Sequence, residues 1–389
     1  MFQVKSTYFV NNQVSLFARM RASYDAIYDI RELEDITLPR DDSSANKKND
    51  DIDNESLSIK EIYLDIYLSD IDIRIGKQIV RWGLLEGSRI IDELNPLDFY
   101  EFIFRDVEDR YIPLWMVKGD YYTDRYSIEG IWIPELRFHK PAPKGSEFEE
   151  FELPPDIKRP PIKLRNSEFA LKWSGDIDGL EVESAYLYTW DDFPAAFRSV
   201  FGLATDLEDI NFSPRYTRIH IIGGTLSKSV GGMVIGGETS YIIGKFFATK
   251  PEIGNKGFNE LKRDYIKYGM IVNYNLYDIE LSFQFYQQLI INYEQSILQK
   301  RIENVLSLFT RYELFYNRLL MQLFILYFTN NQESLYRPRI NYKVTDHHLL
   351  SIGIDIFEGK DGKIETEDFR FIGFFNKNDR IYIEWKYSF

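Results

Sequence analysis

The feature that most constrains the fold of this chain is the alternation of aliphatic residues with polar or aromatic ones. Between Glu61 and Ile75, aliphatic side chains occupy every second position on either side of a short break at Ser69-Asp70. Successive side chains of a β-strand point to opposite faces, so a period of two predicts strands rather than helices. The same pattern returns as far as the C-terminus, in residues 169–173, 180–190, 279–293, 306–316, 336–344, 350–356 and 381–389. The sequence therefore predicts an all-β fold.

The connections between these runs are of two kinds. Short turn signals, such as Asn11-Asn12 and Tyr277-Asp278, alternate with long polar segments. The long segments cover residues 30–57, 84–111, 139–165, 191–214, 247–263 and 358–367. About 18 tilted strands, with short turns at one end and long loops at the other, are typical of bacterial outer-membrane β-barrels. We therefore predict that residues 1–389 form a single transmembrane, antiparallel, up-and-down β-barrel with short periplasmic turns and long extracellular loops.

Composition excludes several other classes of protein. The chain has 389 residues, of which 44% are hydrophobic, 16% aromatic and 28% charged, which is unlike a disordered chain. Its longest uncharged apolar stretch, residues 319–328, is too short for a membrane-spanning helix. A formal net charge of −14 argues against a nucleic-acid partner. Because the chain has no cysteine, disulfides, thiolate metal sites and cysteine nucleophiles are excluded.

A period of two does not by itself separate a lipid-facing barrel from a soluble β-sandwich, and two features favour lipid. Almost every strand carries an apolar alternate face, as with Ile71, Ile73 and Ile75, and one soluble core could hardly absorb all of these residues. Aromatic residues also gather near strand ends, as with Tyr186 and Trp190, which suits the interfacial girdles of a barrel. We therefore expect the protein in the outer membrane of a Gram-negative bacterium, in contact with lipid and lipopolysaccharide.

The two ends of the chain carry further signals. Residues 381–389 place apolar or aromatic side chains at alternate positions and end on Phe389. This ending resembles the terminal strand of outer-membrane proteins, and the resemblance implies that Trp385, Tyr387 and Phe389 are recognised by the barrel-assembly machinery. The alternative is a soluble terminal strand that happens to end in Phe. At the other end, Met1 leads straight into a strand without the features of a signal peptide, so we interpret it as a start codon added to a mature sequence.

A series of short motifs carries a more specific resemblance. Residues 61–65 are followed by Gly76-Lys77-Gln78, by Trp82-Gly83 and by Asn95-Pro96-Leu97-Asp98. This series resembles a poorly characterised family of proteobacterial outer-membrane proteins whose signature is Gly-Arg-Gln, Trp-Gly and Asn-Pro-x-Asp, although Lys77 stands where the signature has Arg. The chain is more distantly similar, in strand count and acidic character, to the 18-stranded porins of the alginate-export type. Both resemblances imply a channel, and neither names a substrate.

If the apolar alternation faces lipid, the other alternation lines the lumen. We predict that the early strands turn mostly acidic side chains inward, namely Glu61, Asp65, Asp72, Glu129, Glu135, Glu181 and Glu183. The late strands and the first two would turn mostly basic side chains inward, namely Arg19, Arg21, Arg311, Arg337, Arg339, Lys343 and Arg370. An acidic wall would then face a basic one, an arrangement that orients charged or zwitterionic solutes. The alternative is that these charges pair across neighbouring strands and only keep a polar interior satisfied.

Residues 84–110 are too apolar for a solvated loop. We expect this segment to fold into the barrel and to cover the inner side of residues 319–328, which are apolar on both faces. Asp98 can cap a short helix that begins at Phe99. We predict a constriction loop that includes Asn95, Asp98, Phe99 and Phe102, with a loop packed over the extracellular rim as the alternative. Residues 139–165 are rich in proline and predict an extended extracellular loop.

Candidates for chemistry are few. No serine, second carboxylate or metal-ligand spacing around the four histidines fits a known catalytic constellation, so we predict no enzymatic activity, no metal and no cofactor. The sequence favours a channel for passive or substrate-selective diffusion of small hydrophilic solutes, charged or zwitterionic. The alternatives are a structural barrel that acts as a sleeve for an export or electron-transfer partner and, less favoured, an outer-membrane hydrolase.

Overall fold

The computed structural model describes residues 1–24, 55–142, 148, 157–200, 210–249, 260–360 and 372–388. Nearly all regular structure in these residues is β, as the alternation predicts. The described strands are β1 (Phe2–Phe9), β2 (Val14–Tyr24), β3 (Glu55–Tyr67), β4 (Ile71–Gln78), β5 (Leu114–Tyr122), β6 (Tyr126–Ile133), β7 (Glu168–Ile177), β8 (Leu180–Trp190), β9 (Ala195–Val200), β10 (Ile210–Arg215), β11 (Arg218–Val230), β12 (Met233–Phe247), β13 (Leu261–Leu276), β14 (Ile279–Ile290), β15 (Ile302–Leu314), β16 (Leu319–Phe328), β17 (Glu333–Lys343), β18 (His348–Glu358) and β19 (Arg380–Tyr387). The described helical elements are α2 (Val107–Arg110) and the 3-10 turns η1 (Leu164–Asn166) and η3 (Gly373–Phe375). None of them is long and apolar enough to cross a membrane.

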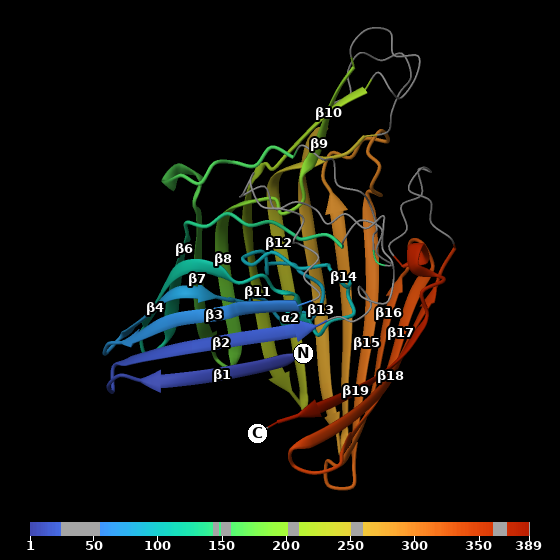
Figure 1. Cartoon of the computed structure of the whole chain (residues 1–389). Coiled ribbons are helices and arrows are strands. Elements are labelled where there is room, and N and C mark those ends of the chain that lie inside the picture. Colours follow the sequence, from blue (N-terminus) through green and yellow to red (C-terminus); the bar gives the residue numbers. More distant parts are fainter. Residues whose placement is uncertain are drawn as a thin grey trace.

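The strands form one 17-stranded antiparallel sheet in which neighbours in sequence are neighbours in space. β1 to β8 pair in order, β8 pairs with β11, and β11 to β19 again pair in order. β9 and β10 leave the sheet as a separate hairpin between β8 and β11. Figure 1 shows the sheet curling around an interior, with this hairpin projecting beyond one end. The predicted antiparallel, up-and-down order is confirmed.

The sheet does not close into a complete barrel within the described residues. β1 and β19 are its two edges, and no ladder of hydrogen bonds joins them. In an up-and-down sheet with an odd number of strands, the first and last strands run in the same direction, so they cannot continue the antiparallel order by pairing with each other. The expected barrel of about 18 strands is therefore an open sheet of 17, and both edges lie on the near side of Figure 1.

The two faces of the sheet differ in chemistry. Many strands expose apolar side chains on the outer face, namely Leu16, Ile75, Leu171, Ile222, Met270, Phe283, Met321 and Ile352. The inner face of the same strands carries buried polar groups such as Asp65, Thr225 and Gln284. Because the two sets alternate along each strand, the period of two in the sequence becomes an apolar outside and a polar inside.

Two apolar clusters interrupt this polar interior. The larger one forms where residues 80–94 pack on the inner faces of β5 to β8 and β11 to β14, and it includes Val80, Trp82, Ile91, Leu94, Ile131, Leu187, Ile221 and Ile290. The smaller one joins Phe102 and Phe104 to Leu335, Phe357, Ile372 and Phe375. Leu326 and Phe328 of β16 pack against the smaller cluster. The inner side of this strand, which is apolar on both faces, is thus covered in part, and its Phe324, Leu326 and Phe328 also line a cavity.

We expect Phe102→Ala to destabilise the protein by about 3–5 kcal/mol, because removing a fully buried ring leaves a cavity. The ring is 1% exposed, and its centroid lies 4.4 Å from that of Phe375. The matched control Phe283→Ala removes an outer-face ring that is 47% exposed and should cost less. Urea-induced unfolding in detergent, followed by tryptophan fluorescence, measures both variants. Equal losses would contradict the role of the smaller cluster.

Candidate functional site

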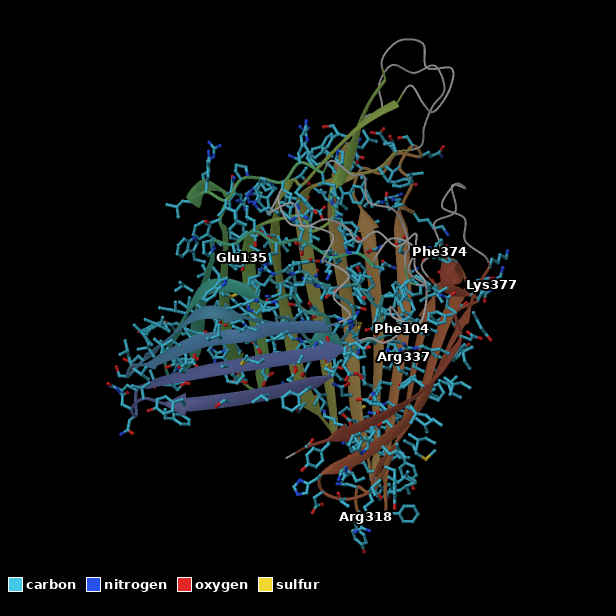
Figure 2. The ribbon with its side chains drawn as sticks, in the orientation of Figure 1. Phe104, Glu135, Arg318, Arg337, Phe374 and Lys377 are labelled. Carbon is cyan, nitrogen blue, oxygen red and sulfur yellow. The ribbon has the colours of Figure 1, made fainter. Side chains whose placement is uncertain are left out.

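The connection between β4 and β5, residues 79–113, folds into the interior, and we call it the inner segment. Its hydrogen bonds reach β12, β13 and β17, across the sheet from the two strands that it joins. Phe104 of this segment and Arg337 of β17 lie close together inside the curled sheet in Figure 2. Because much of this segment is buried, its backbone polar groups need hydrogen-bond partners from the surrounding strands.

A single carboxylate on β12 holds the first part of the inner segment. Buried Glu238 accepts hydrogen bonds from three backbone N–H groups, those of Leu84 (2.8 Å), Leu85 (3.2 Å) and Ile91 (2.9 Å). Gly83 allows this approach, because its φ is +92° and a Cβ there would lie 2.5 Å from a Glu238 oxygen. The glycine of the Trp-Gly motif is therefore required where backbone and carboxylate meet.

Asn95 of the Asn-Pro motif joins the two ends of the inner segment. Its Oδ1 accepts the N–H of Val80 at 2.9 Å, and its Nδ2 donates to the carbonyl oxygens of Ile112 at 2.9 Å and Gln78 at 3.4 Å. The side chain is fully buried, so losing these partners would leave the amide unsatisfied at a cost of about 1–3 kcal/mol. This predicted constriction residue acts as a clamp within the segment.

A charged network ties the inner segment to β13. The carboxylate of Glu93 lies 2.6 Å from the ammonium of Lys267 and 3.5 Å from the guanidinium of Arg89. Arg89 also donates to the carbonyl oxygens of Asp92 and Asn95. Burial opposes the ionisation of Glu93, but Lys267 and Arg89 lower its pKa to about 2. The carboxylate therefore stays charged and binds a wall cation to the inner segment.

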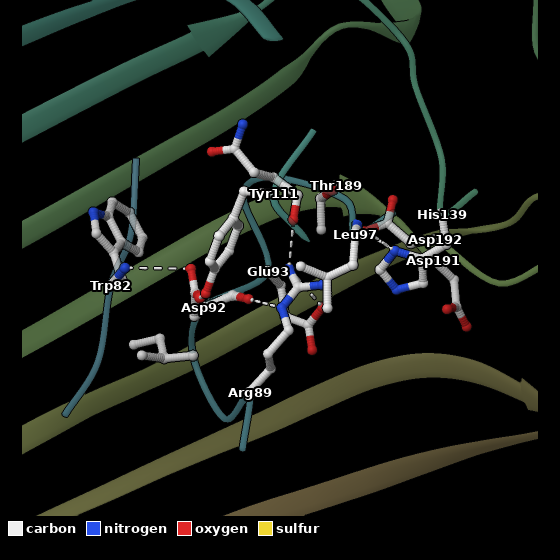
Figure 3. A network of polar contacts seen from close by, with 12 residues as sticks. Trp82, Arg89, Asp92, Glu93, Leu97, Tyr111, His139, Thr189, Asp191 and Asp192 are labelled. Atoms are coloured by element: carbon white, nitrogen blue, oxygen red, sulfur yellow. Dashed lines mark hydrogen bonds and ion pairs between the residues drawn. The ribbon is translucent and has the colours of Figure 1, made fainter. Parts of the chain in front are cut away.

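Two further buried groups complete this network, which Figure 3 shows from close by. The Tyr111 hydroxyl donates to Asp92, and burial together with that carboxylate raises the pKa of Tyr111 to about 12. His139 accepts the N–H of Leu97 through Nδ1 at 2.8 Å. Burial and nearby cations hold the pKa of His139 well below its usual range. Both groups are therefore neutral around neutral pH.

The last part of the inner segment is bound by arginines from opposite ends of the sheet. Asp109 of α2 lies 3.0 Å from Arg19 and also pairs with Arg21, both on β2. Arg337 of β17 donates to two backbone carbonyls of the inner segment at 3.3 and 3.1 Å. Charge-assisted hydrogen bonds of this kind are among the stronger ones in proteins. The inner segment is thus fixed on both sides.

A cavity of about 740 Å³ lies beside the inner segment. Its basic lining residues are Arg89, Arg105, Arg110, Lys245, Lys267, Arg337 and Arg339. Its acidic lining residues are Glu86, Glu93, Asp106, Asp191, Asp192 and Glu303. Amides such as Gln288 and Gln322 and aromatic rings such as Phe99 and Trp190 complete the wall. The cavity wall therefore combines apolar surface with charged groups of both signs, and the cavity is the candidate site for a solute.

The predicted basic residues do not share one environment. Arg337 and Arg339 line the cavity and pair with carboxylates at 2.7 and 2.6 Å. Arg19 and Arg21 are buried against the inner segment. Of the remaining ones, Arg311 pairs with Glu280 and Glu313, Lys343 is exposed at the end of β17, and Arg370 lies outside the described residues.

The predicted acidic residues lie along β3 to β8, and none of them lines the cavity as far as the described residues show. Most pair with a base on the same or a neighbouring strand. The pairs are Glu61 with Arg19 (3.4 Å), Asp65 with Arg74 (2.6 Å), Glu129 with Lys118 (3.1 Å), Glu183 with Lys172 (3.3 Å) and Glu135 with Arg137 (2.6 Å). Glu135 lies beyond the end of β6, and Asp72 and Glu181 lie next to short turns. Pairing between neighbours thus accounts for most of these charges.

The helix expected at Phe99 is wrong. Phe102 has a φ of +50°, which interrupts any α-helix, and its N–H bonds to the carbonyl of Phe99 as in a turn. The Asp98 side chain accepts the N–H of Tyr100 at 2.9 Å and so caps this turn. The helix begins later, at Val107. Of the predicted constriction residues, Phe99 lines the cavity and Phe102 is buried in the smaller apolar cluster.

Two other predicted regions are described only in part. Trp385 and Tyr387 lie exposed on β19, at an edge of the sheet, while Phe389 is outside the described residues. Of the proline-rich segment 139–165, the structure describes 139–142, 148 and 157–165. Lys140 pairs with the inner segment, since its N–H donates to the carbonyl of Leu97 at 2.9 Å. The assembly signal and the extracellular placement stay predictions.

Sequence analysis missed most of the charged residues that build the cavity. These are Glu86, Arg89, Glu93, Arg105, Asp106, Arg110, Asp191, Asp192, Lys245, Lys267 and Glu303, and the neutral His139 was missed as well. They come from separate connections and strands and meet only through the fold. One signal was available, because Arg89, Asp92 and Glu93 flank Ile90 and Ile91 in a segment expected to bury itself. Within the described ranges, no group of three or more His, Asp or Glu residues could hold a metal ion.

The protein thus belongs to the class of antiparallel up-and-down β folds, with a sheet that curls around an inner segment and a cavity. The family model described as "Protein of unknown function (DUF1302)" matches residues 2–288, and the chain belongs to this family. No curated protein matches the sequence. The finer Gly-Arg-Gln signature and the similarity to alginate-export porins stay predictions.

Several solved structures resemble this chain. OccAB1 of Acinetobacter baumannii has 9% identity and a TM-score of 0.48, over 92% of this chain and 83% of that one. OccAB2 of the same organism has 10% identity and a TM-score of 0.47, over 92% and 85%. The outer membrane channel DcaP of Acinetobacter baumannii has 9% identity and a TM-score of 0.43, over 87% and 78%.

We expect Glu238→Gln to loosen the inner segment. Exchange of the Leu84, Leu85 and Ile91 amide protons should accelerate roughly 10–100-fold, since hydrogen bonds to a charged acceptor contribute about 1.5–3 kcal/mol. The matched control Glu280→Gln changes a half-exposed acid of β14 that pairs with Arg311 and should leave these amides unchanged. Hydrogen exchange read by mass spectrometry makes the comparison. Unchanged exchange in Glu238→Gln would show that this carboxylate does not hold the segment.

Proposed function

We propose that this protein is an outer-membrane channel for small hydrophilic solutes. The observation that carries the proposal is the contrast between an apolar outer face and an interior that holds a cavity lined by charges of both signs beside an anchored segment. Apolar side chains exposed on strand after strand are unfavourable in water and well solvated by lipid. A cavity lined by amides and charges offers water and polar solutes a path that lipid does not.

The proposed location is the outer membrane of a Gram-negative bacterium, in contact with lipid and lipopolysaccharide. Exposed aromatic residues close to strand ends support it, among them Tyr122, Tyr126 and Tyr342. Such rings suit the interfacial region of a bilayer, where an apolar body and a polar tip are both accommodated. The proposed partner in folding is the barrel-assembly machinery, and Trp385 and Tyr387, exposed at alternate positions of the last strand, support this role.

The inner segment is proposed to set the width and selectivity of the path. Glu238, Arg19, Arg21 and Arg337 hold it through charged hydrogen bonds, so residues 84–110 would form a fixed constriction rather than a mobile lid. Both signs of charge in the adjacent cavity support passage of charged or zwitterionic solutes. The acidic early strands and the basic late strands would add a transverse field, which their ion pairs weaken.

The two alternatives receive less support. The inner segment occupies space that a plug or an export partner would need inside a sleeve. In the cavity wall, His139 lies 3.7 Å from Asp192, but its Nδ1 already accepts the N–H of Leu97. A neutral histidine with one nitrogen occupied, and no nucleophile hydrogen-bonded to it among the described residues, is a poor catalytic base. We therefore propose no enzymatic activity.

The lack of native cysteine makes the path testable by thiol labelling. We expect Gln322→Cys, whose side chain lines the cavity, to react with a charged methanethiosulfonate reagent. The adduct should lower single-channel conductance by roughly half, because it obstructs a narrow polar path. The matched control Phe283→Cys places its thiol on the outer face and should keep its conductance.

Recordings in planar bilayers measure both variants before and after labelling. A folded protein that conducts no ions before labelling would refute the channel. Full conductance after complete labelling at position 322 would show that the path does not run through this cavity.

A further inference from the structure

A buried guanidinium borders the cavity without an acid to balance it. Arg110, the last residue of α2, lines the cavity and is 8% exposed. Within the described residues Arg110 has no ion pair, and its Nε is fully covered without a hydrogen-bond partner. Taking a charge out of water without a counter-charge is strongly unfavourable. The charge of Arg110 therefore lacks a counter-charge within the described residues.

The other cations of the cavity wall are already paired. Arg89 and Lys267 share Glu93, and Lys245 lies 2.6 Å from Asp191. The remaining pairs are Arg105 with Glu101 (2.7 Å), Arg337 with Asp355 (2.7 Å) and Arg339 with Glu384 (2.6 Å). Arg110 differs from all of them, so an anion that enters the cavity would meet its strongest unsatisfied partner there.

The surroundings keep this position positive. Burial, together with the charges of Arg337 and Arg89, lowers the pKa of Arg110 to about 10, although Tyr111 acts in the opposite direction. At that pKa the guanidinium remains charged at neutral pH. Asp106 also acts on Arg110, but its carboxylate is 78% exposed and lies 3.8 Å from Arg339. The carboxylate that acts on Arg110 is therefore largely solvated and lies near a second arginine.

An apolar wall lies next to this positive position. Phe324, Leu326 and Phe328 of β16 turn into the cavity, and so does Phe309 of β15. In the register of the sheet, Phe324 lies directly opposite Arg337, whose charge acts on Arg110. The cavity thus joins a cationic point to an aromatic and aliphatic surface, which is the chemistry of an amphiphilic anion.

From this juxtaposition we infer that the cavity binds an organic anion with a carboxylate head and an aromatic or other apolar body. The Arg110 guanidinium donates two parallel hydrogen bonds to the carboxylate, a geometry that its planar fork matches. The β16 side chains cover the body and release water from both surfaces. This inference rests on the proposed function, since it names the solute class of the same cavity, but binding does not require conduction.

The experiment measures binding of para-fluorobenzoate to the folded protein in detergent by fluorine NMR. The wild-type protein should bind it at least roughly tenfold more tightly than the neutral isostere para-fluorobenzamide, because only the anion pairs with Arg110. Arg110→Gln should weaken binding roughly 10–100-fold. Arg110→Lys keeps the charge without the fork and should fall between the two.

The control Arg318→Gln removes a cation from the turn between β15 and β16, well away from Phe104 and Arg337 in Figure 2, and should bind as the wild type does. Equal affinity for the acid and the amide, or undiminished binding by either Arg110 variant, overturns the inference. If Arg110→Gln does not fold, as judged by circular dichroism, Arg110→Lys carries the comparison. If the protein conducts ions but does not bind para-fluorobenzoate, this inference is refuted and the channel is not. If it binds para-fluorobenzoate without conducting ions, the channel is refuted and this inference is not.

Discussion

Charged hydrogen bonds between the wall of the sheet and the backbone of the inner segment are the interaction on which the interior of this protein depends. A long connection inside a sheet exposes N–H and C=O groups where strand partners are already taken. Glu238 accepts hydrogen bonds from three of these N–H groups, and Arg337 donates hydrogen bonds to two of the C=O groups. These contacts add a defined orientation to the apolar packing that buries the inner segment, which forms one wall of the cavity.

Apolar packing decides where the cavity lies. Residues 80–94 fill the space against the middle strands, and Phe102 and Phe104 fill the space against the late strands. Between these clusters the inner segment carries charges, which need room and counter-charges rather than close packing. The cavity lies between these two packed regions, and its wall combines charged groups with apolar side chains such as Phe324 and Leu326.

The structural features that depend on local alternation could be predicted from the sequence. The strands, their order and the apolar outer face follow from the period of two, as along Ile279–Ile290. The inner network could not be predicted, because it joins residues far apart in the chain, such as Glu93 with Lys267 and Ile91 with Glu238.

Arg110 shows the same limit at a single residue. It follows Asp106 and Asp109 in sequence. In the structure, however, Asp109 pairs with Arg19 and Arg21 of β2, and Asp106 lies near Arg339. The two acids nearest to Arg110 in sequence thus lie beside arginines from distant strands, which no local spacing indicates.

The open seam between β1 and β19 has a consequence for insertion into a bilayer. Each of these edge strands directs a row of peptide groups toward the gap, and hydrocarbon provides nothing to hydrogen-bond them. An added strand that satisfies both rows has to run opposite to both, from the short-turn end toward the long-connection end. The even strand number of bacterial barrels then follows from peptide chemistry, since only an even count lets every strand lie antiparallel to both neighbours.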